Sequence, residues 1–314
     1  MAEIKLGISA CLLGERVRYD GGHKLDRYLR DELGRFVQYV PVCPEVEAGL
    51  GIPRESLRLV GDPESPRLVT RRTGVDHTAR MQTWGAKRVR ELANEGLCGF
   101  IFKSGSPSSG MERVRVYTAE GMPSKRGRGL WAQAFIDHFP LLPVEDDGRL
   151  HDARIRENFI ERIFIYHRWR QVATKKTRGA LVGFHTRHKL LIFSHSQKHA
   201  RLLGKRVARA REWTPAALYR EYLAFLTDAV KIKASVRNHV NVLQHVMGYF
   251  RKQLSADEKQ ELLETIGEYR KGYVPLIVPI TLVNHYVRKY DQAYLKTQVY
   301  LNPHPTELKL RNHV

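Results

Sequence analysis

Three polar segments in the first half of the chain carry side chains that can do chemistry. Cys11 and Cys43 offer thiolates, which bind soft metals or act as nucleophiles, and Glu45 adds a carboxylate beside the second cysteine. The loop KSGSPSSG, residues 103–110, is rich in serine and glycine and contains no cysteine. Two distant cysteines alone are weak evidence for a site, because free cysteine is often buried filler. A shared site therefore requires a fold that brings the three segments together.

Each of these segments follows a predicted strand. Strands are predicted at residues 4–10, 36–42 and 97–103, with helices between them at residues 24–33 and 74–96. This alternation is typical of βαβ units and predicts a mostly parallel sheet. Ligands of open α/β sheets bind at the carboxyl ends of the strands. Cys11, the CPE triplet at residues 43–45 and the serine-rich loop are therefore expected at one edge of the sheet.

The second half of the chain predicts a different architecture. A segment with two prolines and an acidic run, residues 140–150, resembles a domain boundary. Helical spacing follows it at residues 152–173, 185–202, 214–231, 235–253, 256–271 and 280–293. We therefore expect an α/β domain at residues 1–148 and an all-α domain at residues 149–314.

Positive charge is concentrated in the second half. The formal net charge is +20, and residues 151–314 carry 30 Lys/Arg against 13 Asp/Glu, whereas residues 1–150 carry 23 against 20. Residues 162–211 contain 14 Lys/Arg and no acidic residue. This asymmetry favours a polyanion partner, most often a nucleic acid. The alternative is a solvated basic surface without a partner.

Several side chains of this basic region are candidates for binding RNA. His185, His188, His195 and His199 fall on one face of the expected helix and are too widely spaced to hold one metal ion, so a phosphate-facing surface is favoured over core packing. Trp169 could stack on an unpaired base, although core packing is its commoner role. The predicted RNA-binding residues are Arg168, Arg170, Lys175, Lys176, Arg178, His185, Arg187, His188, Lys189, Lys198 and Arg201.

Composition also bears on location. Three cysteines in 314 residues suit a reducing compartment, where cysteine serves as a metal ligand, a catalyst or plain core. No run of eighteen apolar residues is present, so no membrane span or membrane partner is expected. We therefore expect a cytoplasmic protein.

The serine-rich loop lacks the signatures of two common sites. A phosphate-binding Walker loop needs Lys-Ser/Thr after its last glycine, but Met111 and Glu112 follow Gly110. The G-x-S-x-G pattern of a nucleophile elbow is also absent. From this segment alone, a plain Ser/Gly turn without a ligand is as well supported as a binding loop.

Longer stretches carry a family resemblance. ACLLGERVRYDGG (10–22), VCPEVEAGLGIPR (42–54) and KSGSPSSGMERVRVY (103–117) together resemble the TudS-type thiouracil desulfidases. LVGFHTRHKLLIFSHS (181–196) and LNPHPTELKLRNHV (301–314) resemble the helical domain fused to them in the RudS-type enzymes. The RudS-type enzymes remove sulfur from 4-thiouridine in tRNA.

The resemblance implies a [4Fe–4S] cluster held by three cysteines, with one iron open to the substrate sulfur. Cys11 and Cys43 match two ligands, but the family loop KSRSPSCG here has Ser109 in place of the cysteine and Gly105 in place of the arginine. A hydroxyl is a hard replacement for a soft thiolate. Either Ser109 is an inactivating substitution or the protein ligates differently. Cys98, inside a predicted strand, is a poor substitute, so we expect a labile or absent cluster.

The resemblance also implies roles for Glu45 and Ser104. Exchange of C=S for C=O needs a water activated for attack and a proton for the departing sulfur, so Glu45 is the candidate general base and acid. Ser104 could hydrogen-bond the base or relay a proton, and Lys103 could bind an oxyanion. The purely structural alternatives are that Glu45 caps the next turn and that Ser104 only shapes its loop.

The predicted function is removal of sulfur from 4-thiouridine in tRNA, giving uridine. No nicotinamide or flavin is implied, because exchange of sulfur for oxygen is not a net redox change. One alternative is a desulfidase of free thiouracil bases. The other is an RNA-binding or cluster-sensing protein that has lost its cluster.

Overall fold

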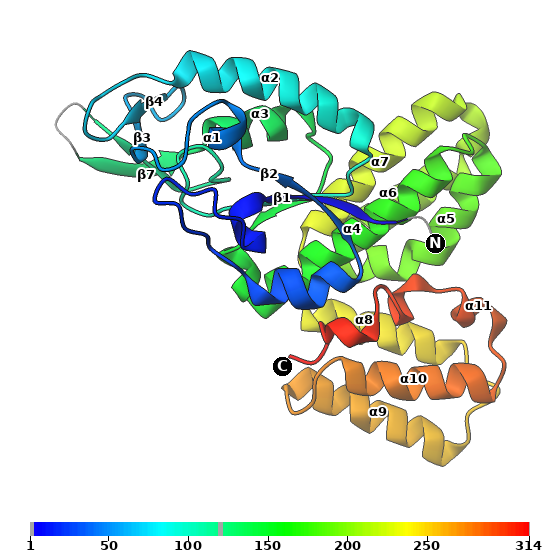
Figure 1. The fold of residues 1–314 in the computed structure, drawn as a ribbon. Coiled ribbons are helices and arrows are strands. Elements are labelled where there is room, and N and C mark those ends of the chain that lie inside the picture. Colours follow the sequence, from blue (N-terminus) through cyan, green and yellow to red (C-terminus); the bar gives the residue numbers. More distant parts are fainter. Residues whose placement is uncertain (1–2, 119–121, 314) are drawn as a thin grey trace. The chain divides into compact units, whose positions relative to one another are not determined.

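The structure is a computed structural model that describes residues 3–118 and 122–313. The chain divides into two compact units, Met1–His151 and Asp152–Val314 (Figure 1). The first unit is α/β and the second is entirely helical, so the predicted fold class is confirmed. No helix in the described part of the chain is both long enough and apolar enough to span a bilayer.

The first unit is built on a four-stranded parallel sheet. Its strands lie in the order β2-β1-β5-β8, and every neighbouring pair is parallel. They are β1 (Lys5–Ser9), β2 (Gln38–Val42), β5 (Phe100–Phe102) and β8 (Val144–Asp146). Strand β8 lies within residues 140–150, which the sequence analysis assigned to a domain boundary, so this segment contributes a strand to the first unit. A three-residue strand next to prolines and acids has too little periodicity to be detected.

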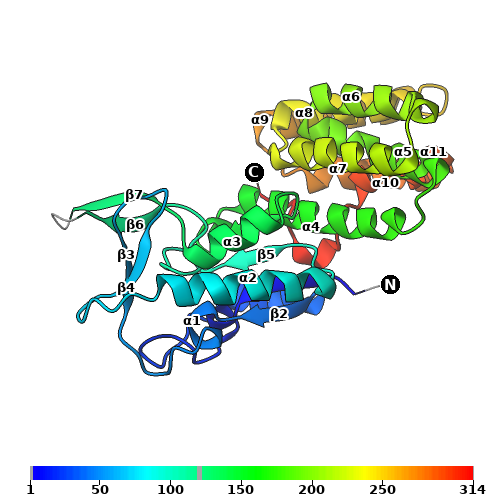
Figure 2. The same cartoon turned by 90° about the horizontal axis from the view of Figure 1, so that it is seen from above.

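Helices α2 (Thr78–Glu95) and α3 (Leu130–His138) lie side by side in the first unit (Figure 2). The rings of Trp84 and Trp131 join them, with centroids 4.9 Å apart. Phe135 of α3 packs on Phe100 of β5, with ring centroids 4.6 Å apart, which fixes α3 against the sheet. The helix expected at residues 24–33 forms only short irregular turns, Tyr28–Glu32 and Leu33–Arg35.

A second four-stranded sheet was not predicted. Its order is β4-β3-β6-β7, with β3 and β6 parallel and the outer pairs antiparallel. The strands are β3 (Leu57–Val60), β4 (Arg67–Thr70), β6 (Val114–Tyr117) and β7 (Pro123–Gly127). Leu59, Leu68 and Val116 are buried together with Met81 of α2. These strands are only four or five residues long, which is too short for their periodicity to be distinguished from the surrounding polar loops.

The second unit consists of helices and short helical turns. The helices are α4 (Ala153–Ala173), α5 (Arg178–His195), α6 (Gln197–Ala208), α7 (Pro215–Lys231), α8 (Val236–Gly248), α9 (Ala256–Lys271), α10 (Ile277–Lys289) and α11 (Ala293–Lys296). A single helix expected at residues 185–202 is in fact two, because Ser196 is extended and its side chain caps α6. The tail adds the turns Val299–Leu301 and Thr306–Leu308.

The core of the second unit is mainly aliphatic, and several aromatic and histidine side chains are buried with it. His185 and His188 are 9% and 2% exposed, so the prediction that they face phosphates is wrong. His188 stacks on Phe184, and Trp169 stacks on Tyr222, which rules out the proposed stacking of Trp169 on a base in this conformation. Helical periodicity grouped these residues on one face but did not reveal that the face points inward.

Buried neutral histidines should make the second unit sensitive to acid. Burial lowers the pKa of His185 and His304 to about 4, and that of His188 and His239 to about 3. The unfolded chain takes up protons on these groups below about pH 6.5, and the folded chain does not. Stability is therefore expected to fall from about pH 6.5 downward by roughly 1 kcal/mol per histidine per pH unit.

The check is urea unfolding, followed by circular dichroism, between pH 7 and pH 5. His188→Gln should reduce the slope of the unfolding free energy against pH by the contribution of one proton. His285→Gln, at an exposed position, should leave this slope unchanged. Identical slopes for the two variants would contradict this assignment.

Candidate active site at the carboxyl edge of the main sheet

The carboxyl edge of the parallel sheet brings the predicted segments around one cavity of about 240 Å³. Cys11 follows β1 in the turn Ala10–Leu13, and Cys43 follows β2. Pro44 then opens the short helix α1 (Pro44–Glu47). The serine-rich loop follows β5. Cys11, Cys43, Glu45, Ser104 and Ser109 all line the cavity.

Both carboxylate oxygens of Glu45 are held by side chains. Arg54 donates from Nε to Glu45 Oε2 at 2.9 Å, and its Nη2 contacts the same oxygen. Ser108 Oγ donates to Glu45 Oε1 at 2.7 Å. The cap of the α1 turn comes instead from Glu47, whose Oε1 accepts from the backbone N–H of Cys43. Glu45 is therefore fixed in the cavity, and the turn-capping alternative does not apply to it.

A second hydrogen-bonded group joins Lys103, Ser104 and Asp147. Lys103 Nζ donates to Ser104 Oγ at 2.9 Å and to Asp147 Oδ2 at 2.7 Å. The Ser104 backbone N–H donates to Asp147 Oδ1 at 2.6 Å. Because Ser104 Oγ accepts from the lysine, its own hydroxyl proton remains available to a bound molecule. Asp147 follows β8 directly, so the unpredicted strand positions this group.

Hydrogen bonds made by backbone groups of the loop hold the segment between Ser104 and Gly110. Ser106 Oγ accepts from the backbone N–H of Ser109 at 3.0 Å, and the Ser108 carbonyl accepts from the N–H of Trp131 in α3. A Cβ on Gly129 would lie 2.4 Å from that carbonyl oxygen, so only glycine allows this approach. Gly105 has φ of +68°, a conformation that the family's arginine would occupy with strain.

The two cysteines of the cavity are poor nucleophiles in this state. Burial raises the pKa of the Cys11 thiol to about 11, partly opposed by the Lys103 charge. Burial also raises the pKa of Cys43. Both thiols are therefore protonated near neutral pH, and a bound metal would be needed to hold them as thiolates. Cys98 is 1% exposed and is plain core, as predicted.

The donor set does not fit a cluster held by three thiolates. Among the described residues, the cavity offers two thiols, and the third position is the hydroxyl of Ser109, a buried residue 4% exposed. A hard, weakly acidic hydroxyl is a poor ligand for cluster iron. Ser109 uses its backbone N–H to hold the loop, and its position in the cavity is the one that the family resemblance assigns to the third ligand.

Three residues of the site were missed by the sequence analysis. Arg54 and Ser108 fix Glu45, and Asp147 holds the Lys103–Ser104 pair. Arg54 ends one of the family-like stretches, but nothing in its spacing pairs it with Glu45. Asp147 lies in the acidic run that the sequence analysis assigned to a domain boundary.

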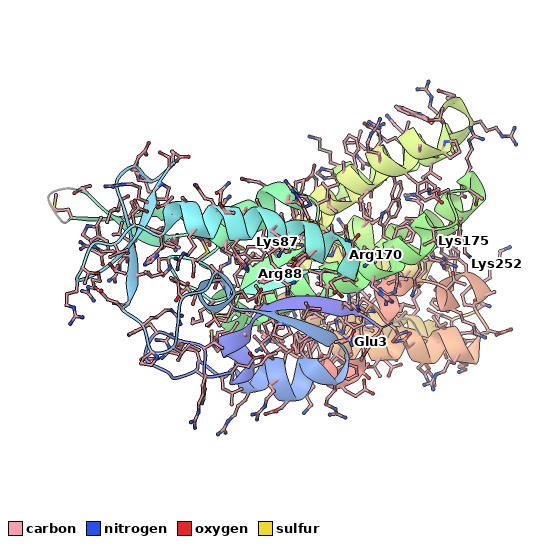
Figure 3. The ribbon with its side chains drawn as sticks, turned by 45° about the horizontal axis from the view of Figure 1, so that its top comes forward. Glu3, Lys87, Arg88, Arg170, Lys175 and Lys252 are labelled. Carbon is pink, nitrogen blue, oxygen red and sulfur yellow. The ribbon has the colours of Figure 1, made fainter. Side chains whose placement is uncertain are left out.

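The predicted RNA-binding residues of the second unit fall into two groups. Arg170, Lys175, Lys176, Arg178, Arg187, Lys198 and Arg201 are exposed; Arg170 and Lys175 are labelled in Figure 3. Arg168, by contrast, is mostly enclosed and donates to the Pro303 carbonyl, which ties the tail to α4. Lys189 lies over the ring of Tyr294, 4.9 Å from its centroid. The enclosed Arg168, like the buried His185 and His188, is an unsuitable phosphate contact.

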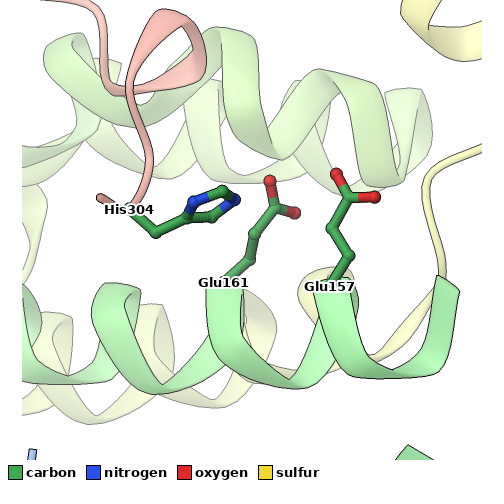
Figure 4. Close-up of side chains that lie close together, drawn as sticks. All are labelled: Glu157, Glu161 and His304. Atoms are coloured by element: carbon green, nitrogen blue, oxygen red, sulfur yellow. The ribbon is translucent and has the colours of Figure 1, made fainter. Parts of the chain in front are cut away.

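Glu157, Glu161 and His304 approach one another in the helical unit (Figure 4). Arg311 lies 2.8 Å from Glu161 Oε1 and 3.4 Å from Glu157 Oε1. His195 lies 3.2 Å from Glu161 Oε2, and His313 lies 2.6 Å from Glu157 Oε2. Since every carboxylate oxygen already has a basic neighbour, the cluster is a structural charge network that attaches the tail to α4.

Comparison with known proteins divides the chain in the same way. Residues 6–147 match the 2-thiouracil desulfurase family, and residues 189–305 match a protein family of unknown function, DUF1722. The chain is 35% identical over 161 residues to the uncharacterized protein YbgA of Escherichia coli (strain K12), covering 51% of this chain and 95% of that protein. A solved structure of the [4Fe-4S]-dependent thiouracil desulfidase TudS shares 31% identity, covers 48% of this chain and 95% of that one, and has a TM-score of 0.39. The chain therefore belongs to the family of YbgA, and it joins a thiouracil desulfurase domain to a DUF1722 domain.

Proposed function

We propose that this protein removes sulfur from 4-thiouridine in tRNA, giving uridine, and that Ser109 keeps the reaction slow in the present sequence. The observation that carries the proposal is the meeting of Cys11, Cys43, Glu45 and Ser104 around one cavity in the domain matched to the desulfurase family. The thiolated uracil base is the proposed occupant of the cavity.

The side chains of this cavity can supply the proton transfers. The oxygen of a water molecule attacks C4 of the base, and Glu45 takes the proton that it loses. The C–S bond then breaks as Glu45 returns this proton to the sulfur, which leaves as hydrosulfide, and the new carbonyl keeps the water oxygen and loses its remaining proton to solvent. Ser104, which accepts from Lys103, donates toward the departing sulfur or toward the base edge. No electrons are exchanged overall, so no nicotinamide or flavin takes part.

The tRNA partner is supported by charge. Residues 151–314 carry an excess of 17 positive charges, and many of the exposed cations lie in the segment without acids. Such a surface binds phosphates largely without regard to sequence, and the target base would be flipped into the cavity. We place the reaction in the cytosol, where cysteine ligands stay reduced.

The experiment compares substrates with the Ser109→Cys variant after anaerobic reconstitution with iron and sulfide. Thiolated tRNA should be converted to the uridine form, followed by mass spectrometry of the nucleosides, with a KM at least about tenfold below that of free 4-thiouracil. Equal reaction of the free base would overturn the tRNA assignment. Tight tRNA binding without any sulfide release, even in this variant, would favour an RNA-binding protein.

A further inference from the structure

A larger groove adjoins the active-site cavity in the first unit. It has a volume of about 760 Å³ and is formed mainly by the second sheet. Tyr19, Ser56, Leu57, Gly105 and Pro107 line both the groove and the cavity, so the two share a wall and a mouth. A molecule whose reacting part enters the cavity would place its remainder along this groove.

The groove is strongly basic. Its charged lining residues in the described part of the chain are Arg58, Arg71, Arg113, Arg115 and Lys125. No ion pair joins any of the five to a described carboxylate, and all but Arg58 are exposed. The neighbouring Glu112 pairs with Arg149 instead, at 2.8 Å. Five cations that pair with no carboxylate among the described residues therefore face one concave surface.

This concentration of charge is local. Residues 1–150 carry 23 Lys/Arg against 20 Asp/Glu, so the first half is nearly neutral as a whole. The second sheet gathers cations from β3, β6, β7 and the turn after β4. Because the domain as a whole is nearly neutral, the basic groove beside its active site is a suitable surface for binding phosphates.

Aromatic rings lie among these cations. Tyr117 lines the groove, and the guanidinium of Arg58 lies over its ring, 5.7 Å from the centroid. Tyr19 is 41% exposed and stands on the wall shared with the cavity. Alternation of phosphate-binding cations with rings that can stack on bases is typical of single-stranded nucleic-acid sites. An acidic protein would use the cations but not the rings.

We infer that this groove binds the RNA backbone next to the thiolated nucleotide, so that the substrate of the cavity is a polynucleotide rather than a free base. The inference rests on the proposed function and adds a second RNA-binding surface, within the catalytic domain, to the basic helical one. Phosphates on either side of a flipped nucleotide must pass the cavity mouth, where the groove begins.

The test measures tRNA binding by the full-length chain without any turnover. Arg115→Gln/Lys125→Gln removes two exposed cations of the groove, and Arg80→Gln/Arg90→Gln removes two exposed cations of α2 that line neither cavity nor groove. Binding of tRNA containing 4-thiouridine is followed by fluorescence anisotropy over a range of salt concentrations.

Loss of two phosphate contacts should lower the log–log salt slope by about 1.4 and weaken binding about tenfold at 0.15 M salt. The α2 pair should change neither quantity by more than a small fraction. Unchanged binding by the groove pair, or equal loss in both pairs, would overturn the inference. So would displacement of tRNA by polyglutamate as readily as by unmodified tRNA. Since sulfide release is not measured, failure of the proposed reaction leaves this result interpretable.

Discussion

Replacing Ser109 by cysteine should convert a protein with little or no cluster absorbance into a brown one and raise sulfide release at least about a hundredfold. Loss of an outer-shell partner typically costs 10–100-fold in metal affinity or activity, and loss of a ligand costs more. The new thiol would line the same cavity as Cys11 and Cys43. Iron content, visible absorbance and sulfide release after anaerobic reconstitution measure the gain.

The matched control is Ser56→Cys, which adds the same thiol to the lining of the same cavity at a position that the family resemblance does not assign to a ligand. It should gain little. Adding Cys11→Ser to Ser109→Cys should abolish the gain, because two thiolates remain. A Ser109→Cys protein that holds no more iron than the unaltered chain would refute the assignment of position 109.

Replacing Arg311 by methionine should lower the free energy of unfolding by about 3–5 kcal/mol, because it leaves buried carboxylates without their cation. Arg311 and Glu161 are each 3% exposed at their side chains, and Glu157 is 12% exposed. Burial opposes the ionisation of Glu161, but the His195 hydrogen bond and the Arg311 charge outweigh it and hold its pKa below the ordinary range.

The pH dependence of this loss has a definite sign. A carboxylate with a lowered pKa in the folded state stabilises above the pKa of the unfolded chain, about 4.3, and that stabilisation fades as the pH falls. The difference between Arg311→Met and the unaltered protein should therefore shrink below about pH 4. Urea unfolding measures it, with Arg237→Met at an exposed position as control. A loss below about 1 kcal/mol at pH 7 would show that the network contributes little.

The main sheet and the meeting of its loops could be predicted because buried parallel strands are continuous apolar runs and their carboxyl ends share an edge. This was enough to place Cys11, Cys43 and the serine-rich loop around one cavity. The partners of Glu45 were out of reach, because Arg54 and Ser108 meet it through turns whose geometry depends on tertiary contacts. Asp147 was missed together with its three-residue strand.

The basic surfaces show where counting charges fails. The total for each half drew attention to the second half, but it hid the groove of the first, whose cations are balanced in sequence by acids located elsewhere. Helical spacing likewise grouped His185 and His188 without revealing that packing against Phe184 and Tyr222 buries them.

The serine-rich loop can accept either serine or cysteine at position 109. Ser109 supports its loop through a main-chain N–H, which any residue can supply, and the remaining restraints come from Ser106, Gly129 and α3. A change between sulfur and oxygen at this side chain therefore leaves the scaffold intact. A single codon change between serine and cysteine would therefore alter the set of soft ligands in this cavity while the protein goes on folding.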